Sequence, residues 1–167
     1  MELSEKKNID KITIKDITNN CKLTPTTFYN HFKDKYDLIV WIYSTSVEKI
    51  MNKIGINGYE WRHTLVDGVK YAVENKKFLI NAITHTNGQN SFINNMTRIN
   101  LNVFLDIIKK NNNLNVISKK IETISKIYVY GSVCMLCEWL IDKNSIEFDE
   151  FIKLMEETLP EALREYL

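Results

Sequence analysis

Apolar residues recur at intervals of three and four along most of the chain, and short polar segments separate the runs. This spacing predicts a long helix from Lys35 to about Ile54, followed by Gly55–Gly58 as a break. It predicts further helices over residues 60–74, 77–86, 89–110, 115–142 and 147–165. Pro160 lies inside the last of these and is expected to kink or shorten it. The pattern therefore predicts an all-α protein.

Two shorter helices are expected before Lys35. Thr13, with Asp16 three positions later, is a close relative of the capping box, and it would start a helix with Ile14, Ile17 and Cys21 on one face.

A second cap follows at once. Thr24 precedes Pro25, and proline is favoured at the first helical position because its missing N–H would be unpaired there. This helix is expected over residues 25–32, with Phe28 and Phe32 on one side, and Asp34 is expected to cap the long helix that follows. Two short helices separated by about three residues, the second with a polar outer face, form a helix-turn-helix.

Composition supports a helical globular protein. Five glycines and two prolines are too few for a sandwich or barrel built on tight turns, and 44% hydrophobic with 26% charged residues is ordinary for a globular chain. No uninterrupted apolar run approaches the ~18–20 residues of a membrane span, and the N-terminus lacks the apolar core of a signal peptide. Three cysteines do not suggest a disulfide framework. A cytoplasmic location without membrane contact is expected.

The segment from Ile14 to Ile39 resembles the DNA-binding domain of the TetR family. The string Thr27-Phe28-Tyr29-Asn30-His31-Phe32-Lys33-Asp34-Lys35-Tyr36-Asp37-Leu38 matches the end of that family's recognition helix and the start of the next helix. The resemblance implies a DNA-binding domain over residues 1–45 and a helical ligand-binding and dimerisation domain over residues 46–167. Met1–Lys7 resembles the tail of the family's first helix, so the first helix is expected to be truncated in this sequence or to start upstream of Met1.

Residues on and around the second short helix are expected to contact DNA. Thr26 and Thr27 are short enough for close backbone approach, and a threonine methyl packs on a thymine methyl. Tyr29 and His31 offer polar tips to phosphates, and Lys35 begins the next helix, whose N-terminus also favours phosphate. The full expected set is Thr13, Lys15, Thr26, Thr27, Tyr29, Asn30, His31, Lys33 and Lys35.

Net charge adds little to this interpretation. The chain carries a net charge of +1, and residues 138–167 are strongly acidic, so a DNA-binding face must lie elsewhere. The modest charge and the short first helix leave an alternative open. In that alternative the chain is a helical, dimeric interaction module of the same fold that no longer binds DNA.

The second domain is expected to hold the dimer interface and the signal. The resemblance implies a homodimer through residues 115–142 and 147–165. Such a dimer would present two DNA-binding domains to a palindromic operator. Trp41-Ile42-Tyr43 resembles a TetR subgroup that includes activators of dihydroxyacetone-kinase operons, in which a kinase-like partner protein carries the signal. Elsewhere in the family a small-molecule effector does so.

A few mid-chain residues are candidates for a ligand pocket, although aromatic residues at helical spacing are more typical of a core. They are Trp61, His63, His85, Asn87, Arg98 and Tyr128.

Cys134 and Cys137 have the spacing of a redox or zinc pair. No second pair or nearby histidine completes a metal site, and cysteines in an apolar helix behave as small hydrophobic residues, so core packing is expected for both. A redox sensor is the alternative. No catalytic, metal-binding or cofactor-binding motif is present in the sequence, so an enzyme is not expected.

Overall fold

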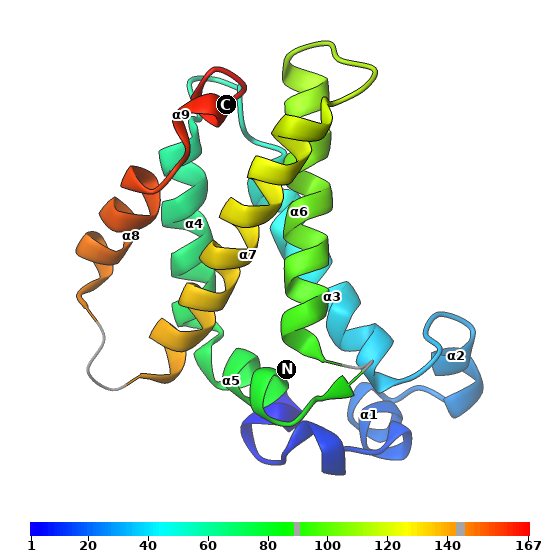
Figure 1. Ribbon diagram of the computed structural model, residues 1–167. Helices are drawn as coiled ribbons and strands as arrows, with labels where there is room; N and C mark the ends of the chain where they lie inside the picture. The colour runs from blue at the N-terminus through cyan, green and yellow to red at the C-terminus, as the bar shows by residue number, and fades with distance from the viewer. Residues whose placement is uncertain (89–90, 143–145) are drawn as a thin grey trace.

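The computed structural model describes residues 1–88, 91–142 and 146–167, and these residues form helices without any strand (Figure 1). The α-helices are α1 (Ile14–Cys21), α2 (Pro25–Tyr29), α3 (Lys35–Met51), α4 (Trp61–Glu74), α5 (Lys76–Thr84), α6 (Phe92–Asn111), α7 (Lys119–Ile141), α8 (Phe148–Glu157) and α9 (Glu161–Arg164). Two 3-10 turns, η1 (Glu2–Glu5) and η2 (Ile9–Lys11), precede them. The all-α prediction is confirmed.

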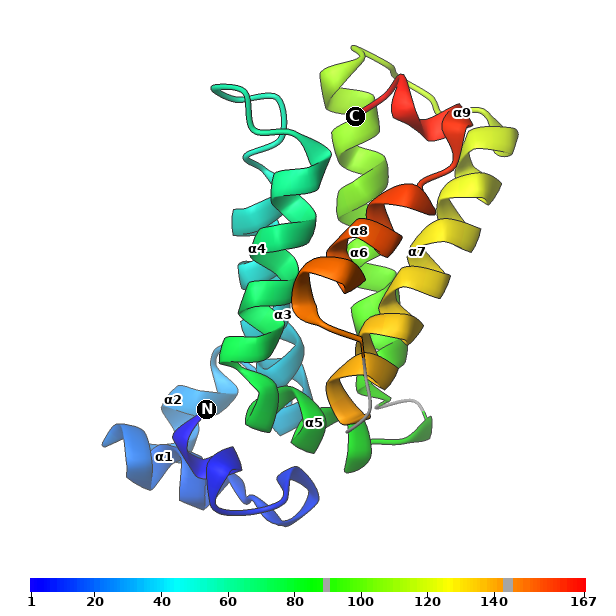
Figure 2. The ribbon, with the colours of Figure 1, turned by 90° about the vertical axis from the view of Figure 1, so that its left-hand side faces the viewer.

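The helix-turn-helix and the C-terminus lie at opposite ends of the molecule. In Figure 1, α1 and α2 lie at the lower end, and α3 rises from them beside α6. The long helices α6 and α7 pack against each other, and α8 packs on α4 (Figure 2). Helix α3 therefore connects the helix-turn-helix directly to the helical bundle.

The predicted starts of α1, α2 and α3 are confirmed by their capping hydrogen bonds. Thr13 and Asp16 form a reciprocal capping box at the start of α1. The Thr24 hydroxyl accepts a hydrogen bond from a backbone N–H of α2, and Pro25 occupies the first turn. The Asp34 carboxylate accepts hydrogen bonds from two N–H groups of α3. Such caps stabilise a helix by about 1 kcal/mol each, and they are readable from sequence because they are local.

Several helix ends differ from the predicted ones. Helix α2 stops at Tyr29, α3 stops at Met51, and α7 begins only at Lys119, where the Ser118 side chain caps it. The predicted final helix is divided into α8 and α9, with Pro160 as the N-cap of α9. The proline effect was thus predicted correctly. The predicted start of a helix at residues 89–90 lies outside the described residues.

One large core fills the space between α3, α5, α6 and α7. Tyr43 and Phe78 each meet Phe92 edge to face, with ring centroids 5.5 and 6.2 Å apart. Phe104 meets Trp61 in the same way at 5.2 Å. These contacts order the bundle through shape as well as through burial.

A smaller cluster fixes α8 against α4. Phe151 and Ile152 of α8 are buried with Leu65 and Val69 of α4. Phe151 also stacks on Trp139 of α7, with 4.7 Å between ring centroids. The acidic helix α8 is therefore held through its apolar face.

Candidate functional site

The helix-turn-helix is held together by a small buried face. Phe28 on α2 is 5% exposed and lies against the rings of Tyr29 and Phe32. Thr18, rather than Cys21, is the buried residue at the C-terminal part of α1, and Cys21 is exposed. The short helix α1 therefore buries only a narrow stripe.

Most of the residues predicted to contact DNA have exposed side chains. Tyr29, at the end of α2, is 58% exposed, which is unusual for so large an aromatic side chain. Thr27 is half-buried, and its hydroxyl lies 2.9 Å from that of Thr24. The others with exposed side chains are Thr13, Lys15, Thr26, Asn30, His31 and Lys33. The outer surface of α2 is thus polar and open.

Lys35 is engaged inside the protein. Its ammonium group donates hydrogen bonds to the backbone carbonyls of Asp10, at 2.7 Å, and Ile12, at 2.8 Å. Partial burial lowers the pKa of the Lys35 ammonium from its usual range. Two of its three protons are therefore committed to holding the segment that leads into α1.

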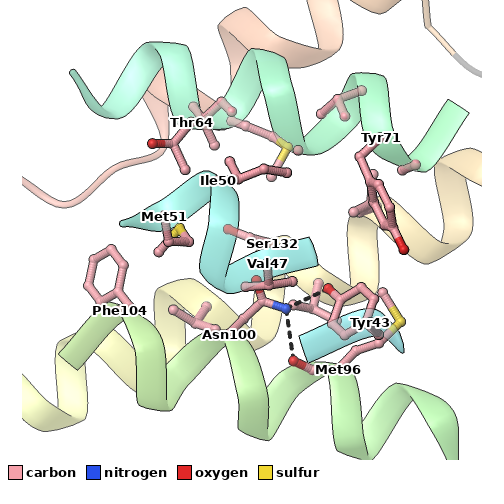
Figure 3. Close-up of a pocket in the computed structure, with 18 of the residues that line it drawn as sticks. Tyr43, Val47, Ile50, Met51, Thr64, Tyr71, Met96, Asn100, Phe104 and Ser132 are labelled. Atoms are coloured by element: carbon pink, nitrogen blue, oxygen red, sulfur yellow. Dashed lines mark hydrogen bonds between the residues drawn. The ribbon is translucent and has the colours of Figure 1, made fainter. Parts of the chain in front are cut away.

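A cavity of about 100 Å³ lies between α3, α4, α6 and α7 (Figure 3). Tyr43, Val47 and Met51 reach it from α3, so the cavity borders the helix that follows the helix-turn-helix. None of the residues lining it carries a charged side chain. The walls are almost wholly apolar, which favours an uncharged occupant because an unpaired ion would lose its hydration there.

A few polar side chains stand among these walls. The Asn100 amide donates hydrogen bonds to the Tyr43 hydroxyl, at 2.6 Å, and to the Met96 carbonyl, at 2.8 Å (Figure 3). Burial raises the pKa of the Tyr43 hydroxyl, which stays protonated at neutral pH. Sequence reasoning missed Asn100, and the signal was an amide side chain within the otherwise apolar face of α6.

The structure brings together only two of the predicted pocket residues. Trp61 and Tyr128 both line the cavity, and the Trp61 indole N–H donates to the Tyr128 hydroxyl at 3.2 Å. His63, His85, Asn87 and Arg98 lie outside its lining. Arg98 is exposed and donates to the Asn95 side chain, because its position on α6 faces away from the bundle.

Helix α7 has a second apolar face that points outward. Ile127 is 71% exposed, and Tyr130, Met135 and Ile141 are each about half exposed on the same helix. Gly131 lies in the middle of this face, and nothing in the described residues lies within 4 Å of a Cβ placed there. Large exposed apolar surfaces of this kind mark contacts with another molecule, in addition to the contacts that the helix makes with the core.

The same property gives α7 the composition of a membrane span. Among the residues that the structure describes, Lys119–Ile141 is the one helix long and apolar enough for a span. Its most apolar 18-residue stretch has a mean hydropathy of 1.3, and 33% of that stretch is buried. One such helix is weak evidence for a membrane, since core helices pass the same test. Here its inner face packs into the core through Val129, Val133 and Leu140.

The two cysteines of α7 differ in their exposure to solvent. Cys137 is buried, 4.0 Å from the Met96 sulfur, and burial raises the pKa of its thiol to about 12. Cys134 is exposed, which corrects the expectation that both pack in the core. Within residues 1–88, 91–142 and 146–167, no group of His, Cys, Asp and Glu side chains could hold a metal ion.

Comparison with known proteins places these features in a family. Residues 59–161 match the family model TetR_C_8, described as the C-terminal region of transcriptional regulators. The HTH-type dhaKLM operon transcriptional activator DhaS of Lactococcus lactis subsp. lactis (strain IL1403) is 27% identical over 77 residues, which are 46% of this chain. The matched segment spans 41% of that relative's own length.

A solved structure supports the fold. The dihydroxyacetone kinase operon activator DhaS superposes with a TM-score of 0.66 at 20% sequence identity, over 95% of this chain and 90% of the other. The likeness to this subgroup, expected from the aromatic residues around Trp41, is therefore found in both sequence and fold. The proteins matched are transcription regulators rather than enzymes. The chain belongs to the TetR family of transcriptional regulators.

Proposed function

We propose that this chain binds an operator through α2 and acts in the cytoplasm as a transcription regulator. The observation that carries the proposal is the exposed polar surface of α2, held in place by buried Phe28 and by the caps of three successive helices. An exposed helix of this kind fits the DNA major groove, and its side chains reach base edges and phosphates. Residues 1–45 would form the reader, and residues 46–167 the regulatory part.

Two copies of the chain would form a dimer through α7 and α8, and the dimer would bind DNA. The outward apolar face of α7, centred on Gly131, gives a partner helix close access. On α8, Leu154 is an exposed apolar side chain among charged neighbours. A two-fold axis there would place two readers on one side of the duplex.

The operator itself is the first test of this proposal. Selection from a random duplex pool is expected to enrich an inverted repeat, with half-sites spaced by ~10–10.5 bp or a multiple of that, since one helical turn returns the groove to the same side. Failure of any sequence to be enriched, while the protein remains folded and dimeric, would favour the interaction module that does not bind DNA.

Lys35 and Lys33 are expected to contribute to binding in different ways. Lys35→Gln removes the tie to the Asp10 and Ile12 carbonyls, so operator affinity falls while its salt dependence stays unchanged. Lys33→Gln removes an exposed charge, so the salt slope falls by about 1. Fluorescence anisotropy at several salt concentrations measures both effects. A reduced slope for Lys35→Gln would show instead that its ammonium meets a phosphate.

The cavity suits a small, uncharged, apolar effector. Benzene occupies an apolar cavity of ~150 Å³, so a cavity of about 100 Å³ accepts something smaller, such as a chain of about three or four heavy atoms. Such a ligand would press on α3 through Val47 and Met51 and so act on the reader. A partner protein, as in the subgroup that the chain resembles, is the second candidate for the signal.

A matched pair of probes tests this assignment. 1-Propanol is expected to bind and to raise the melting temperature, whereas propionate, of similar size but charged, does not bind. Gly68 lines the cavity, and a Cβ placed there has nothing within 4 Å among the described residues. Gly68→Leu should therefore fill the space and abolish 1-propanol binding measured by calorimetry. Equal affinity for both probes would contradict an effector site of this chemistry.

A further inference from the structure

The segment that leads into α1 is held from two sides. Lys35, at the start of α3, binds the carbonyls of Asp10 and Ile12. The side chain of Asn81, on α5, binds the same segment further upstream. Ile9, whose N–H takes part in the Asn81 contact, is 1% exposed. The approach to α1 is therefore fixed by side chains that come from outside the helix-turn-helix.

Asn81 uses its whole amide group for this contact. Its Oδ1 accepts a hydrogen bond from the Ile9 backbone N–H at 2.9 Å. Its Nδ2 donates to the Ser4 carbonyl at 2.7 Å and to the Lys7 carbonyl at 2.9 Å. One side chain thus satisfies three backbone groups that lie 72 to 77 residues away in the sequence.

Helix α5 also borders the cavity. Leu79, two residues before Asn81, is fully buried and lines it. Phe78 is buried on the same short helix and lies with Ile9 and Ile12 around a hollow beneath the N-terminal segment. Figure 1 shows this segment running beside α5. A shift of α5 would therefore be transmitted to the residues in front of α1.

We infer that Asn81 is a positioning residue for DNA binding: it clamps the N-terminal segment to α5 and so sets the orientation of the reader relative to the regulatory bundle. The inference rests on the proposed DNA-binding function. It adds a second connection to the reader, through α5, beside the continuous helix α3. Asn81 itself is not assigned any contact with DNA.

The chemistry of the amide makes the clamp testable with nearly isosteric variants. Asn81→Asp keeps the acceptor for the Ile9 N–H, but it loses both donors and places a negative charge beside two carbonyl oxygens. Asn81→Ala removes all three hydrogen bonds. Asn112 offers a matched control, since its amide donates to the Tyr166 carbonyl at 3.1 Å and clamps the C-terminus.

The experiment measures three quantities on the full chain: affinity for the selected operator duplex, amide hydrogen exchange at Ile9, and the melting temperature. We expect Asn81→Asp and Asn81→Ala to lose about tenfold in affinity, within the usual range of coupling between sites, and to exchange faster at Ile9. Asn112→Ala should lower the melting temperature while leaving affinity and Ile9 exchange unchanged.

Two outcomes would overturn the inference. One is wild-type affinity and Ile9 protection in both Asn81 variants. The other is a loss of affinity that follows the melting temperature equally in the Asn81 and Asn112 variants, because that pattern indicates general destabilisation. If the wild-type chain binds no duplex, the proposed function fails, and the exchange at Ile9 still decides whether Asn81 holds the segment.

Discussion

Ile127→Glu is expected to convert the proposed dimer into a monomer and to abolish tight operator binding. Ile127 is the most exposed apolar residue of α7, and a carboxylate there would be buried without a partner in a symmetric interface. Joining two binding units raises overall affinity by about 10²–10⁴-fold, and the monomer forfeits that gain. Sedimentation and anisotropy with the operator duplex measure the two effects on the same sample.

The control places the same charge elsewhere. Ile56 is also an exposed isoleucine, in the connection between α3 and α4, so Ile56→Glu should leave the dimer and its affinity unchanged. A dimer that persists in Ile127→Glu would move the interface away from this face of α7. Monomers that keep full affinity would separate DNA binding from dimerisation.

Phe28→Ala is expected to unfold the helix-turn-helix and to eliminate DNA binding. Removing a buried phenylalanine costs about 3–5 kcal/mol, which exceeds what a five-residue helix and its small buried face supply. The bundle of α4, α6 and α7 does not depend on this side chain. Near-ultraviolet circular dichroism and sedimentation should therefore report a bundle and dimer that remain, while anisotropy reports no operator binding.

A substitution at the neighbouring Tyr29 distinguishes loss of folding from loss of contact with DNA. Tyr29→Ala removes a side chain that is 58% exposed and keeps only an edge-to-face contact with Phe28, so the free energy of unfolding should fall by about 1 kcal/mol, well below the loss in Phe28→Ala. Operator affinity should nevertheless fall, because the phenol would lose its contact with the duplex. Equal destabilisation by the two substitutions would show that Tyr29 is structural, and unchanged affinity in Tyr29→Ala would remove it from the interface.

Local chemistry explains why the helix starts were predictable. The caps at Thr13, Thr24 and Asp34 each involve residues only two or three positions apart, so the sequence contains both partners side by side. Pro160 acts locally as well, through its missing N–H. The long family-like string from Thr27 to Leu38 added the identity of the reader, which periodicity alone does not supply.

The features that the sequence did not predict depend on contacts between residues far apart in the chain. The cavity exists because helices far apart in the sequence meet around it, and helical spacing marks Asn100 only as one polar position on α6. The partners of Asn81 lie more than seventy residues away. Cys134 and Cys137 share an apolar helix, but the helix has two apolar faces, and only the packing determines which cysteine faces inward.

Salt-dependent binding of the selected operator measures the central claim most directly. Neutralising phosphates releases counterions, so a true reader loses affinity linearly on a logarithmic scale as salt rises, with a slope of about −0.9 for each phosphate contacted. We predict tight binding of the operator over a scrambled duplex, a steep slope, and a loss of that preference in Tyr29→Ala. Equal, weak and salt-independent binding of both duplexes by the intact dimer would contradict the account.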